Sequence, residues 1–390
     1  MIIHRAIEDT LKRQFGTFPI IALTGPRQAG KTTLLKDIFS QIPYVSLEDL
    51  DTRSFAREDP RGFLTTHSPP VIFDEVQHVP ELFSYIQTKS DEERKTGQYI
   101  LSGSQHFLLL DNISQSLAGR AGILHLLPFT MQEVEHLDTF PVRYEDLIYR
   151  GLYPRIWDIE SLEPSIWYRS YIKTYLERDV RSIKEVTDLS QFHKFLKLCA
   201  GRTGQILNLS ALANDTGITH NTARSWISVL ETSFVVFLLK PYYKNFNKQI
   251  TKSPKLYFYD AGLATSLLGI ESPQQIITHP LKGALFETMI VSEFIKYQMN
   301  TQRSDVGFYL RDKTGHEIDY LAKQAGGDSI AVEIKAGKTV SSDYFENLRY
   351  WDGMTQEGIG KNYVVYGGDQ IQKRTEGSVL PWKKVSEVFK

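Results

Sequence analysis

The chain has 390 residues, of which 41% are apolar and 23% charged, so it can bury the cores of two or three domains. Its formal net charge of −1 excludes a global field that would attract nucleic acid or an anionic membrane, and any nucleic-acid site must be a local patch. The single Cys199 excludes an internal disulfide. No signal peptide and no apolar run long enough to span a bilayer are recognisable, which predicts a cytoplasmic protein without membrane contact.

The first region, to about residue 130, alternates short apolar runs with helical stretches. Strands are expected at residues 19–24, 43–47, 71–73 and 98–102. Continuous apolar strands separated by helices are typical of a parallel sheet that is covered on both faces. We therefore predict an α/β fold for this region.

A glycine-rich segment follows the first of these strands and precedes a helical stretch. It fits the phosphate-loop pattern G-x-x-x-x-G-K-[ST] in the context that the pattern requires. Glycines let the backbone N–H groups wrap phosphates, the lysine reaches the β- and γ-phosphates, and the threonine hydroxyl takes Mg²⁺. The predicted ligands are ATP and Mg²⁺, and the predicted nucleotide-binding residues are Gly25, Pro26, Arg27, Gln28, Ala29, Gly30, Lys31, Thr32 and Thr33.

Two carboxylates end the third expected strand. We predict that Asp74 holds Mg²⁺ together with Thr32, and that Glu75 acts as the general base on the attacking water, with Lys31 as a further catalytic residue. A glutamate directly after the aspartate favours ATP hydrolysis over a pure nucleotide switch.

Two further residues are candidates for the same reaction. Ser104 follows the strand at 98–102 and is expected to orient water against the γ-phosphate, unless the segment is a simple Ser-Gly turn. Arg120 either reaches the γ-phosphate of a neighbouring subunit as an arginine finger, which implies a homo-oligomer, or bridges to a local acid on the surface.

In this order, the motifs resemble a bacterial and archaeal group of AAA+-like ATPases that carry a C-terminal domain of unknown function, DUF4143. Beyond the phosphate loop, the resemblance rests on residues 73–77, 102–104, 117–120, 127–129, 175–180, 254–263, 315–320 and 332–335. It implies an AAA+-like parallel-sheet ATPase core, a helical lid, a winged-helix segment and an α/β restriction-endonuclease-like terminus. We place these four parts at residues 1–130, 131–190, 191–272 and 273–390.

The third part contains the pattern of a helix-turn-helix unit. Residues 209–218 form a capped short helix and a glycine turn, and Thr219 caps a second helix at 220–232. On this second helix an apolar stripe faces the core, whereas His220, Asn221 and Arg224 face outward and are candidates for a DNA major groove.

The segment after this helix interleaves lysines with aromatic residues. A strand at 234–239 and the following stretch to Lys255 would form a wing, in which Lys244 and Lys248 are expected to contact phosphates. Because Arg224 is the one basic residue of the expected recognition helix besides His220, packing between domains remains the alternative to DNA contact.

The last part brings acids and a lysine together. Glu317 and Asp319 share one face of an expected strand, and Glu333 and Lys335 share one face of the next. With Glu287 on the preceding helix, the series resembles the PD-(D/E)xK nuclease pattern, although the proline is missing before Asp319. The resemblance implies that Asp319 and Glu333 bind Mg²⁺ and that Lys335 positions the attacking water, either in a nuclease or in an inert relic.

These features predict a Mg²⁺-dependent ATP hydrolase that couples its nucleotide state to DNA binding or processing by the C-terminal half. The alternative is a nucleotide-dependent signalling or assembly switch that acts on protein partners and carries a catalytically inert nuclease-like domain.

Overall fold

The computed structural model describes residues 2–103, 117–176, 188–242, 252–303, 307–323, 329–355 and 361–389. The chain divides into two compact units, which are described separately below. The first comprises Met1–Phe129, Thr232–Phe234 and Met299–Gln302. The second comprises Thr130–Glu231, Val235–Gln298 and Arg303–Lys390.

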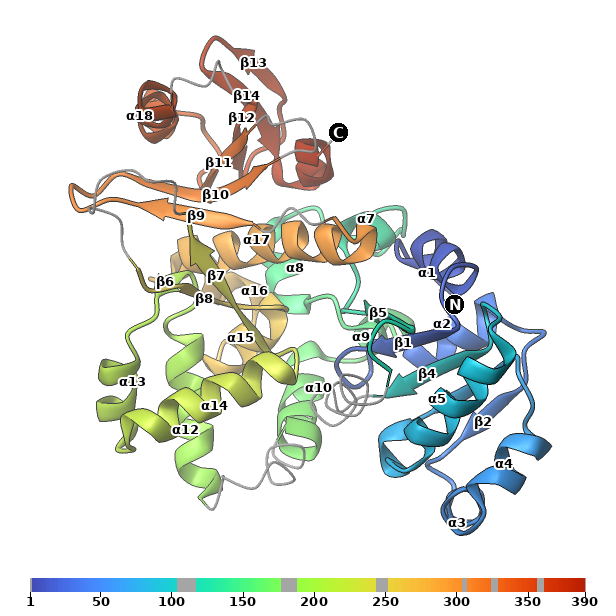
Figure 1. The fold of residues 1–390 in the computed structure, drawn as a ribbon. Coiled ribbons are helices and arrows are strands. Elements are labelled where there is room, and N and C mark those ends of the chain that lie inside the picture. The colour runs from blue at the N-terminus through green and yellow to red at the C-terminus, as the bar shows by residue number, and fades with distance from the viewer. Residues whose placement is uncertain are drawn as a thin grey trace. The chain divides into compact units, whose positions relative to one another are not determined.

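The first unit is built around a five-stranded sheet in the order β2-β3-β4-β1-β5, in which every pairing is parallel (Figure 1). Its strands are β1 (Ile20–Thr24), β2 (Tyr44–Ser46), β3 (Val71–Asp74), β4 (Tyr99–Gly103) and β5 (Ala121–His125). All residues of β1, β3 and β4 are buried, as expected when helices cover both faces of a sheet. The predicted parallel α/β sheet is confirmed.

Helices cover the two faces of this sheet in two groups. The helices are α1 (Glu8–Phe15), α2 (Lys31–Ile38), α3 (Leu50–Glu58), α4 (Pro60–Thr66) and α5 (Leu82–Glu93), with a short 3₁₀ turn η1 (Val76–His78). Along β1, Ile20 and Ala22 join a core cluster with residues of α3, α4 and α5, whereas Ile21 and Leu23 join a cluster with α1 and α2. Because alternate side chains of β1 point to opposite faces of the sheet, the strand contributes to two separate hydrophobic cores.

The second unit begins with helices and contains a long mixed sheet. Its helices up to residue 232 are α7 (Met131–Val134), α8 (Tyr144–Arg150), α9 (Pro154–Asp158), α10 (Pro164–Tyr171), η2 (Ile172–Leu176), α12 (Leu189–Ala200), α13 (Leu209–Thr216) and α14 (His220–Thr232). The later ones are α15 (Ala261–Leu267), α16 (Pro273–Thr278), α17 (Lys282–Thr301), η3 (Ser342–Phe345), α18 (Glu346–Thr355) and η4 (Trp382–Phe389). No helix among the residues described above is both long and apolar enough to cross a bilayer.

The sheet of this unit has nine strands in the order β13-β14-β12-β11-β10-β9-β7-β8-β6. They are β6 (Gln205–Ile206), β7 (Val236–Pro241), β8 (Lys255–Phe258), β9 (Phe308–Arg311), β10 (Glu317–Lys323), β11 (Ser329–Lys335), β12 (Lys361–Tyr366), β13 (Gln372–Arg374) and β14 (Gly377–Pro381). The strands β7 and β9 pair in parallel through Lys240 with Phe308 and Pro241 with Tyr309 (Figure 1). One sheet therefore spans the boundary expected at residue 272, and the four domain limits remain predictions.

Helices α13 and α14 meet at a glycine turn. Gly217 has a left-handed backbone, with φ 86°, which a residue with a Cβ rarely adopts. Asn208 and Thr219 accept N–H bonds from Ala211 and Thr222 and so cap the two helices. The expected apolar stripe of α14 is buried, and Trp226 packs its ring 5.2 Å from those of both Phe192 and Phe195 on α12.

The end of β5 offers a pH-dependent test of the first unit's stability. His125 Nδ1 lies 2.8 Å from Thr24 Oγ1 at the end of β1, and burial lowers the pKa of this histidine from 6.5 to about 4. Below pH 6.5 the unfolded chain therefore takes up a proton that the folded unit refuses, so stability falls as the pH drops from 6.5 toward 4 and then levels off. Replacing His125 with Gln should flatten the profile in this window, by up to about 3 kcal/mol at its acid end.

Urea unfolding at a series of pH values from 4 to 7 measures this difference. The control is His136→Gln, because His136 is exposed. Identical pH profiles for wild type and His125→Gln would contradict the expected role of the buried imidazole.

Candidate functional site

The glycine-rich loop joins β1 to α2 and passes close to the segment after β5. Gly25 and Gly30 have φ values of 150° and 93°, both in the region that favours glycine. A Cβ atom on Gly25 would lie 2.0 Å from the carbonyl oxygen of Leu126, so no other residue fits there without displacing backbone. Glycine is thus required at the two positions for different reasons. At Gly25 another backbone segment comes too close for a side chain, and at Gly30 the residue that precedes α2 has a left-handed backbone conformation.

The side chain of Lys31 folds over this loop. Its Nζ donates to the carbonyl oxygens of Gly25 and Pro26, at 2.9 Å each, and the residue is 6% exposed. Lys31 is the first residue of α2, so the ammonium group and the helix N-terminus present their positive charge at the same loop.

The structure brings Thr32 and Asp74 together, although they are far apart in sequence. Thr32 lies in the first turn of α2, and its Oγ1 donates to Oδ2 of Asp74 at 2.8 Å. Asp74 is the last residue of β3, at the same edge of the sheet as the end of β1. A threonine hydroxyl beside a buried carboxylate is an oxygen donor set that suits Mg²⁺.

Two hydroxyl groups that the sequence analysis missed also donate to Asp74. Tyr44 on β2 donates to Oδ2 and Ser102 on β4 donates to Oδ1, both at 2.5 Å. Burial raises the pKa of Asp74, but the hydrogen bonds from Ser102, Tyr44 and Thr32 outweigh it and lower this pKa below the ordinary value. The carboxylate is therefore held ionised.

The signal for Ser102 was present in the sequence, because polar residues at the end of a parallel strand gather at one edge of the sheet. Ser104, the residue predicted from the same strand end, lies outside the described residues. Tyr44 is the second residue of the strand expected at residues 43–47, far from its end, and no such pattern marks it.

Glu75 follows Asp74 in a left-handed backbone conformation, with φ 55°, that costs a residue with a side chain on the order of 1 kcal/mol or more. Its backbone N–H donates to Asp74 Oδ1 at 3.0 Å, and the side-chain amide of Gln77 donates to its carboxylate. These contacts set the direction of the Glu75 side chain.

A buried arginine that the sequence did not predict as a site residue forms hydrogen bonds to the backbone of the phosphate loop. Arg5 is 6% exposed and donates from Nη1 to the carbonyl of Ala29, at 2.9 Å, and from Nη2 to the carbonyl of Leu127, at 2.6 Å. Its guanidinium lies 4.6 Å from the ring centroid of Phe129. It ties the phosphate loop to the segment after β5. Arg5 stands in a polar N-terminal stretch, where no spacing pattern marks it.

Arg120 lies at the opposite end of the strands from the phosphate loop. It directly precedes β5, whose first residue Ala121 pairs with Ile20 at the start of β1, whereas the loop follows the end of β1. Its Nε and Nη2 donate to the carboxylate of Asp91 at 2.6 and 2.9 Å. The local ion pair is present, and contact with a neighbouring subunit's nucleotide stays a prediction.

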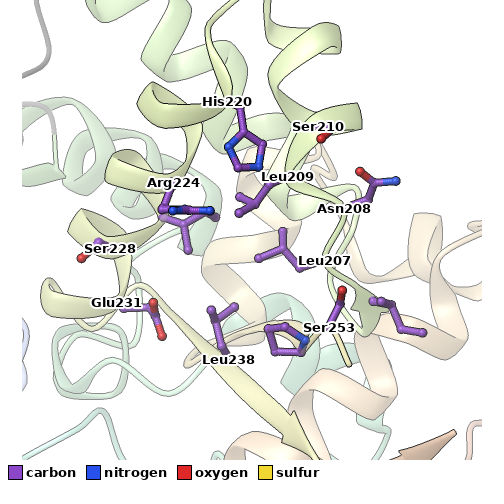
Figure 2. Close-up of a pocket in the computed structure, with 13 residues that line it drawn as sticks. Leu207, Asn208, Leu209, Ser210, His220, Arg224, Ser228, Glu231, Leu238 and Ser253 are labelled. Carbon is purple, nitrogen blue, oxygen red and sulfur yellow. The ribbon is translucent and has the colours of Figure 1, made fainter. Parts of the chain in front are cut away.

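The outward side of α14 borders a pocket of about 600 Å³ in the second unit (Figure 2). His220 and Arg224 line it, and Glu231 lies on the same helix, where burial raises the pKa of its carboxyl group. Asn221 is exposed. The other lining residues are Ile206, Leu207, Asn208, Leu209, Ser210, Ile227, Ser228, Leu238, Ser253 and Pro254. The wing residues Lys244 and Lys248 lie outside the described part of the chain.

The four residues of the nuclease-like pattern meet in one cluster of the second unit. The pairing of Tyr320 with Val332 brings Asp319 beside Glu333, and Asp319 Oδ2 accepts the N–H of Ile334 at 2.8 Å. Lys335 Nζ donates to Glu333 Oε2 at 2.6 Å. Glu287 on α17 reaches the same cluster through Lys255.

Lys255, the first residue of β8, is the member of this cluster that the sequence analysis did not assign to it. Its side chain is 2% exposed, and its Nζ forms ion pairs with Glu287 Oε1 at 2.9 Å, with Asp319 Oδ1 at 3.8 Å and with Glu317. The sequence predicts Lys255 as the last lysine of the wing segment, because sequence alone does not show that β8 and β10 belong to one sheet.

The charges of the cluster shift one another's protonation. Burial, and then the charge of Asp319, raise the pKa of Glu333 to about 8. Burial also raises the pKa of Glu287. Among the residues that the structure describes, no group of three or more His, Cys, Asp or Glu side chains is arranged to hold a metal ion. The ammonium group of Lys255 lies among these carboxylates, and the Mg²⁺ site expected at Asp319 and Glu333 stays a prediction.

Comparison with known families divides the chain into three matched segments. Residues 17–135 match the AAA domain family, residues 142–274 match a domain of unknown function, DUF8612, and residues 282–385 match the domain of unknown function DUF4143. The first unit thus carries an AAA-type, P-loop ATPase-like domain.

Relatives match along most of the chain. An uncharacterized protein of Mycobacterium tuberculosis is 29% identical over 87% of this chain and 76% of its own length. One of Methanocaldococcus jannaschii is 24% identical over 93% of this chain and 84% of its own. Among solved structures, the Walker-type ATPase of Pyrococcus abyssi is 15% identical, with a TM-score of 0.48, over 68% of this chain and 96% of that protein.

The contact between Arg5 and the phosphate loop leads to a prediction. Arg5→Ala leaves the carbonyl groups of Ala29 and Leu127 without these donors, which destabilises the observed conformation of the loop by about 1–3 kcal/mol. We expect the affinity for a fluorescent ATP analogue to fall on the order of tenfold, measured by titration. Arg13→Ala is the control, because Arg13 is exposed on α1. Unchanged affinity in Arg5→Ala would show that the loop holds its shape without this arginine.

Proposed function

We propose that the protein is a Mg²⁺-dependent ATP hydrolase whose nucleotide state controls DNA binding by its C-terminal half. The observation that carries the hydrolase proposal is the hydrogen bond of 2.8 Å between the Thr32 hydroxyl and the ionised Asp74 carboxylate, next to the loop that Lys31 covers. The AAA domain match over residues 17–135 supports it.

Each residue of the site has a proposed part. The loop Gly25–Thr32 binds the phosphates with its backbone N–H groups, and Lys31 binds the β- and γ-phosphates. Thr32 and Asp74 would hold Mg²⁺, which offsets phosphate charge when bound. Ser102 and Tyr44 keep Asp74 ionised and oriented.

Glu75 is the proposed general base. It directly follows the metal-binding carboxylate, and Gln77 restrains its side chain. In this position it takes the proton of a water molecule that attacks the γ-phosphate. The proposals that Ser104 orients this water and that Arg120 acts on a neighbouring subunit's nucleotide rest on the sequence.

Two variants separate binding from hydrolysis. Lys31→Ala should lose measurable ATP binding, because it removes the cation that offsets phosphate charge. Glu75→Gln should bind ATP like the wild type but release phosphate 10²–10⁴-fold more slowly, since it keeps the shape and loses the base. Fluorescent nucleotide titration and a phosphate-release assay measure the two effects. Glu81→Gln, an exposed glutamate in the same unit, is the control. Wild-type turnover in Glu75→Gln would remove Glu75 from the mechanism.

The DNA part of the proposal rests on the second unit. Helices α12, α13 and α14 with strands β6, β7 and β8 follow the element order of a winged helix. His220, Asn221 and Arg224 lie at or near the start of α14, on its outward side. We propose that they contact DNA, that Lys244 and Lys248 contribute phosphate contacts from the wing, and that the C-terminal strands form a nuclease-like scaffold.

Filter binding of short duplex and branched DNA, with and without ATP, tests this part. We expect the two nucleotide states to differ in affinity, and Arg224→Ala to weaken binding by about 1–3 kcal/mol if Arg224 reads a base. Arg155→Ala provides the control, because Arg155 is exposed on α9 of the same unit and pairs with Asp158. Equal and negligible DNA binding in both nucleotide states would refute the coupling.

A second candidate function is a nucleotide-dependent switch that acts on protein partners and carries an inert nuclease-like domain. Its specific support is the lysine inside the acid cluster, together with the near-zero net charge of the chain. It is the function to pursue if ATP is hydrolysed but DNA is not bound.

A further inference from the structure

The acid cluster of the second unit contains its own cation. The ammonium group of Lys255 forms ion pairs with Glu287, Glu317 and Asp319, which come from α17 and β10. At 2% exposure, its side chain is shielded from water almost completely. A charge buried to this degree is stable only when it is paired, and here it is paired three times.

The position of this ammonium group is set by strand pairing. Lys255 pairs with Leu239 of β7 on one side and with Ile206 of β6 on the other. Two residues further on the same face, Tyr257 donates its hydroxyl to Glu287 Oε1 at 2.5 Å. Lys255 is therefore held by the sheet, unlike a lysine on an exposed loop.

A divalent metal would compete with Lys255 for the same oxygen atoms. Mg²⁺ binds carboxylate oxygens at 2.0–2.1 Å, and Glu287 Oε1 already accepts from both Lys255 and Tyr257. A dication next to a buried ammonium group would also suffer like-charge repulsion, which is strong where water is excluded.

Two acids of the cluster pair with cations other than Lys255. Glu317 also pairs with Arg311, at 3.2 Å, and Glu333 with Lys335, at 2.6 Å. The four carboxylates of the cluster thus face three cationic side chains, Lys255, Arg311 and Lys335. These cations neutralise most of the carboxylate charge that would attract Mg²⁺ to the cluster.

We infer that Lys255 is the resident cation of this cluster and excludes a divalent metal, so that Glu287, Glu317 and Asp319 form an ion-pair network that joins β8 to α17 and β10. These residues then support no metal-dependent cleavage. The inference does not depend on ATP hydrolysis or on DNA binding, and its test uses neither.

The first experiment leaves Lys255 in place. Mn²⁺, as a paramagnetic probe for Mg²⁺, is titrated into the full-length, nucleotide-free protein and followed by electron paramagnetic resonance. Wild type and Asp319→Asn should bind Mn²⁺ equally, because any binding near Asp74 is common to both. A Mn²⁺ site in the wild type that Asp319→Asn removes would overturn the inference.

The second experiment removes the cation. Lys255→Met keeps most of the length of the side chain and deletes its charge. We therefore expect it to gain a Mn²⁺ site in this cluster, with an affinity at least tenfold higher than that of the wild-type cluster. The gain should disappear when Asp319→Asn is added. Lys296→Met is the matched control, since Lys296 is also buried and pairs with Glu293 at 2.9 Å outside the cluster.

A folded Lys255→Met protein that gains no Mn²⁺ site would also overturn the inference, because the lysine would then not be what excludes the metal. Circular dichroism shows whether the variant folds. If it does not, the comparison of wild type with Asp319→Asn decides the question alone.

Discussion

The nucleotide site depends on one buried carboxylate that three hydroxyl groups hold in place. Asp74 accepts hydrogen bonds from Thr32, Tyr44 and Ser102, which come from α2, β2 and β4. A buried carboxylate without such donors would protonate, and a protonated aspartate is a poor ligand for a hard cation. The parallel sheet explains one of these contacts, because β3 and β4 end side by side and place Asp74 beside Ser102. The hydroxyl of Tyr44 comes from the start of β2, and that of Thr32 from the first turn of α2.

The second unit also contains a buried charge that its neighbours stabilise, but there the central charge is positive. There a buried ammonium group is surrounded by carboxylates from a helix and from a strand of the same sheet. In the first unit the hydrogen bonds to the Asp74 side chain from other side chains come from neutral hydroxyl groups, so its negative charge is left available for a cation. In the second unit the compensation is ionic and internal, so little negative charge is left. Two sites that both consist of acids and lysines in the sequence are therefore suited to different tasks.

Sequence patterns predicted the functional residues that lie close together in one short segment of the chain. The phosphate loop, its lysine and the parallel strands around it were predicted because each lies within one short segment with its own period or spacing. Thr32 and Asp74 were predicted to share Mg²⁺ because the phosphate-loop pattern assigns the threonine to the metal and a nearby apolar strand ends in two carboxylates. Arg5, Tyr44 and Lys255 were missed, since each acts on residues brought near by the fold and none stands in a recognisable pattern.

The parallel α/β core and its phosphate-binding loop follow from the amino-acid sequence, because backbone periodicity and the Gly25–Thr32 spacing are local properties. The sequence also indicates which acids and lysines belong to the C-terminal strands. How these charges are compensated depends on contacts that only the folded chain creates. Lys255 enters the acid cluster because β7 pairs with β9 and extends one sheet from the hairpin into the C-terminal strands. Burial then makes the ammonium group and its carboxylates depend on one another.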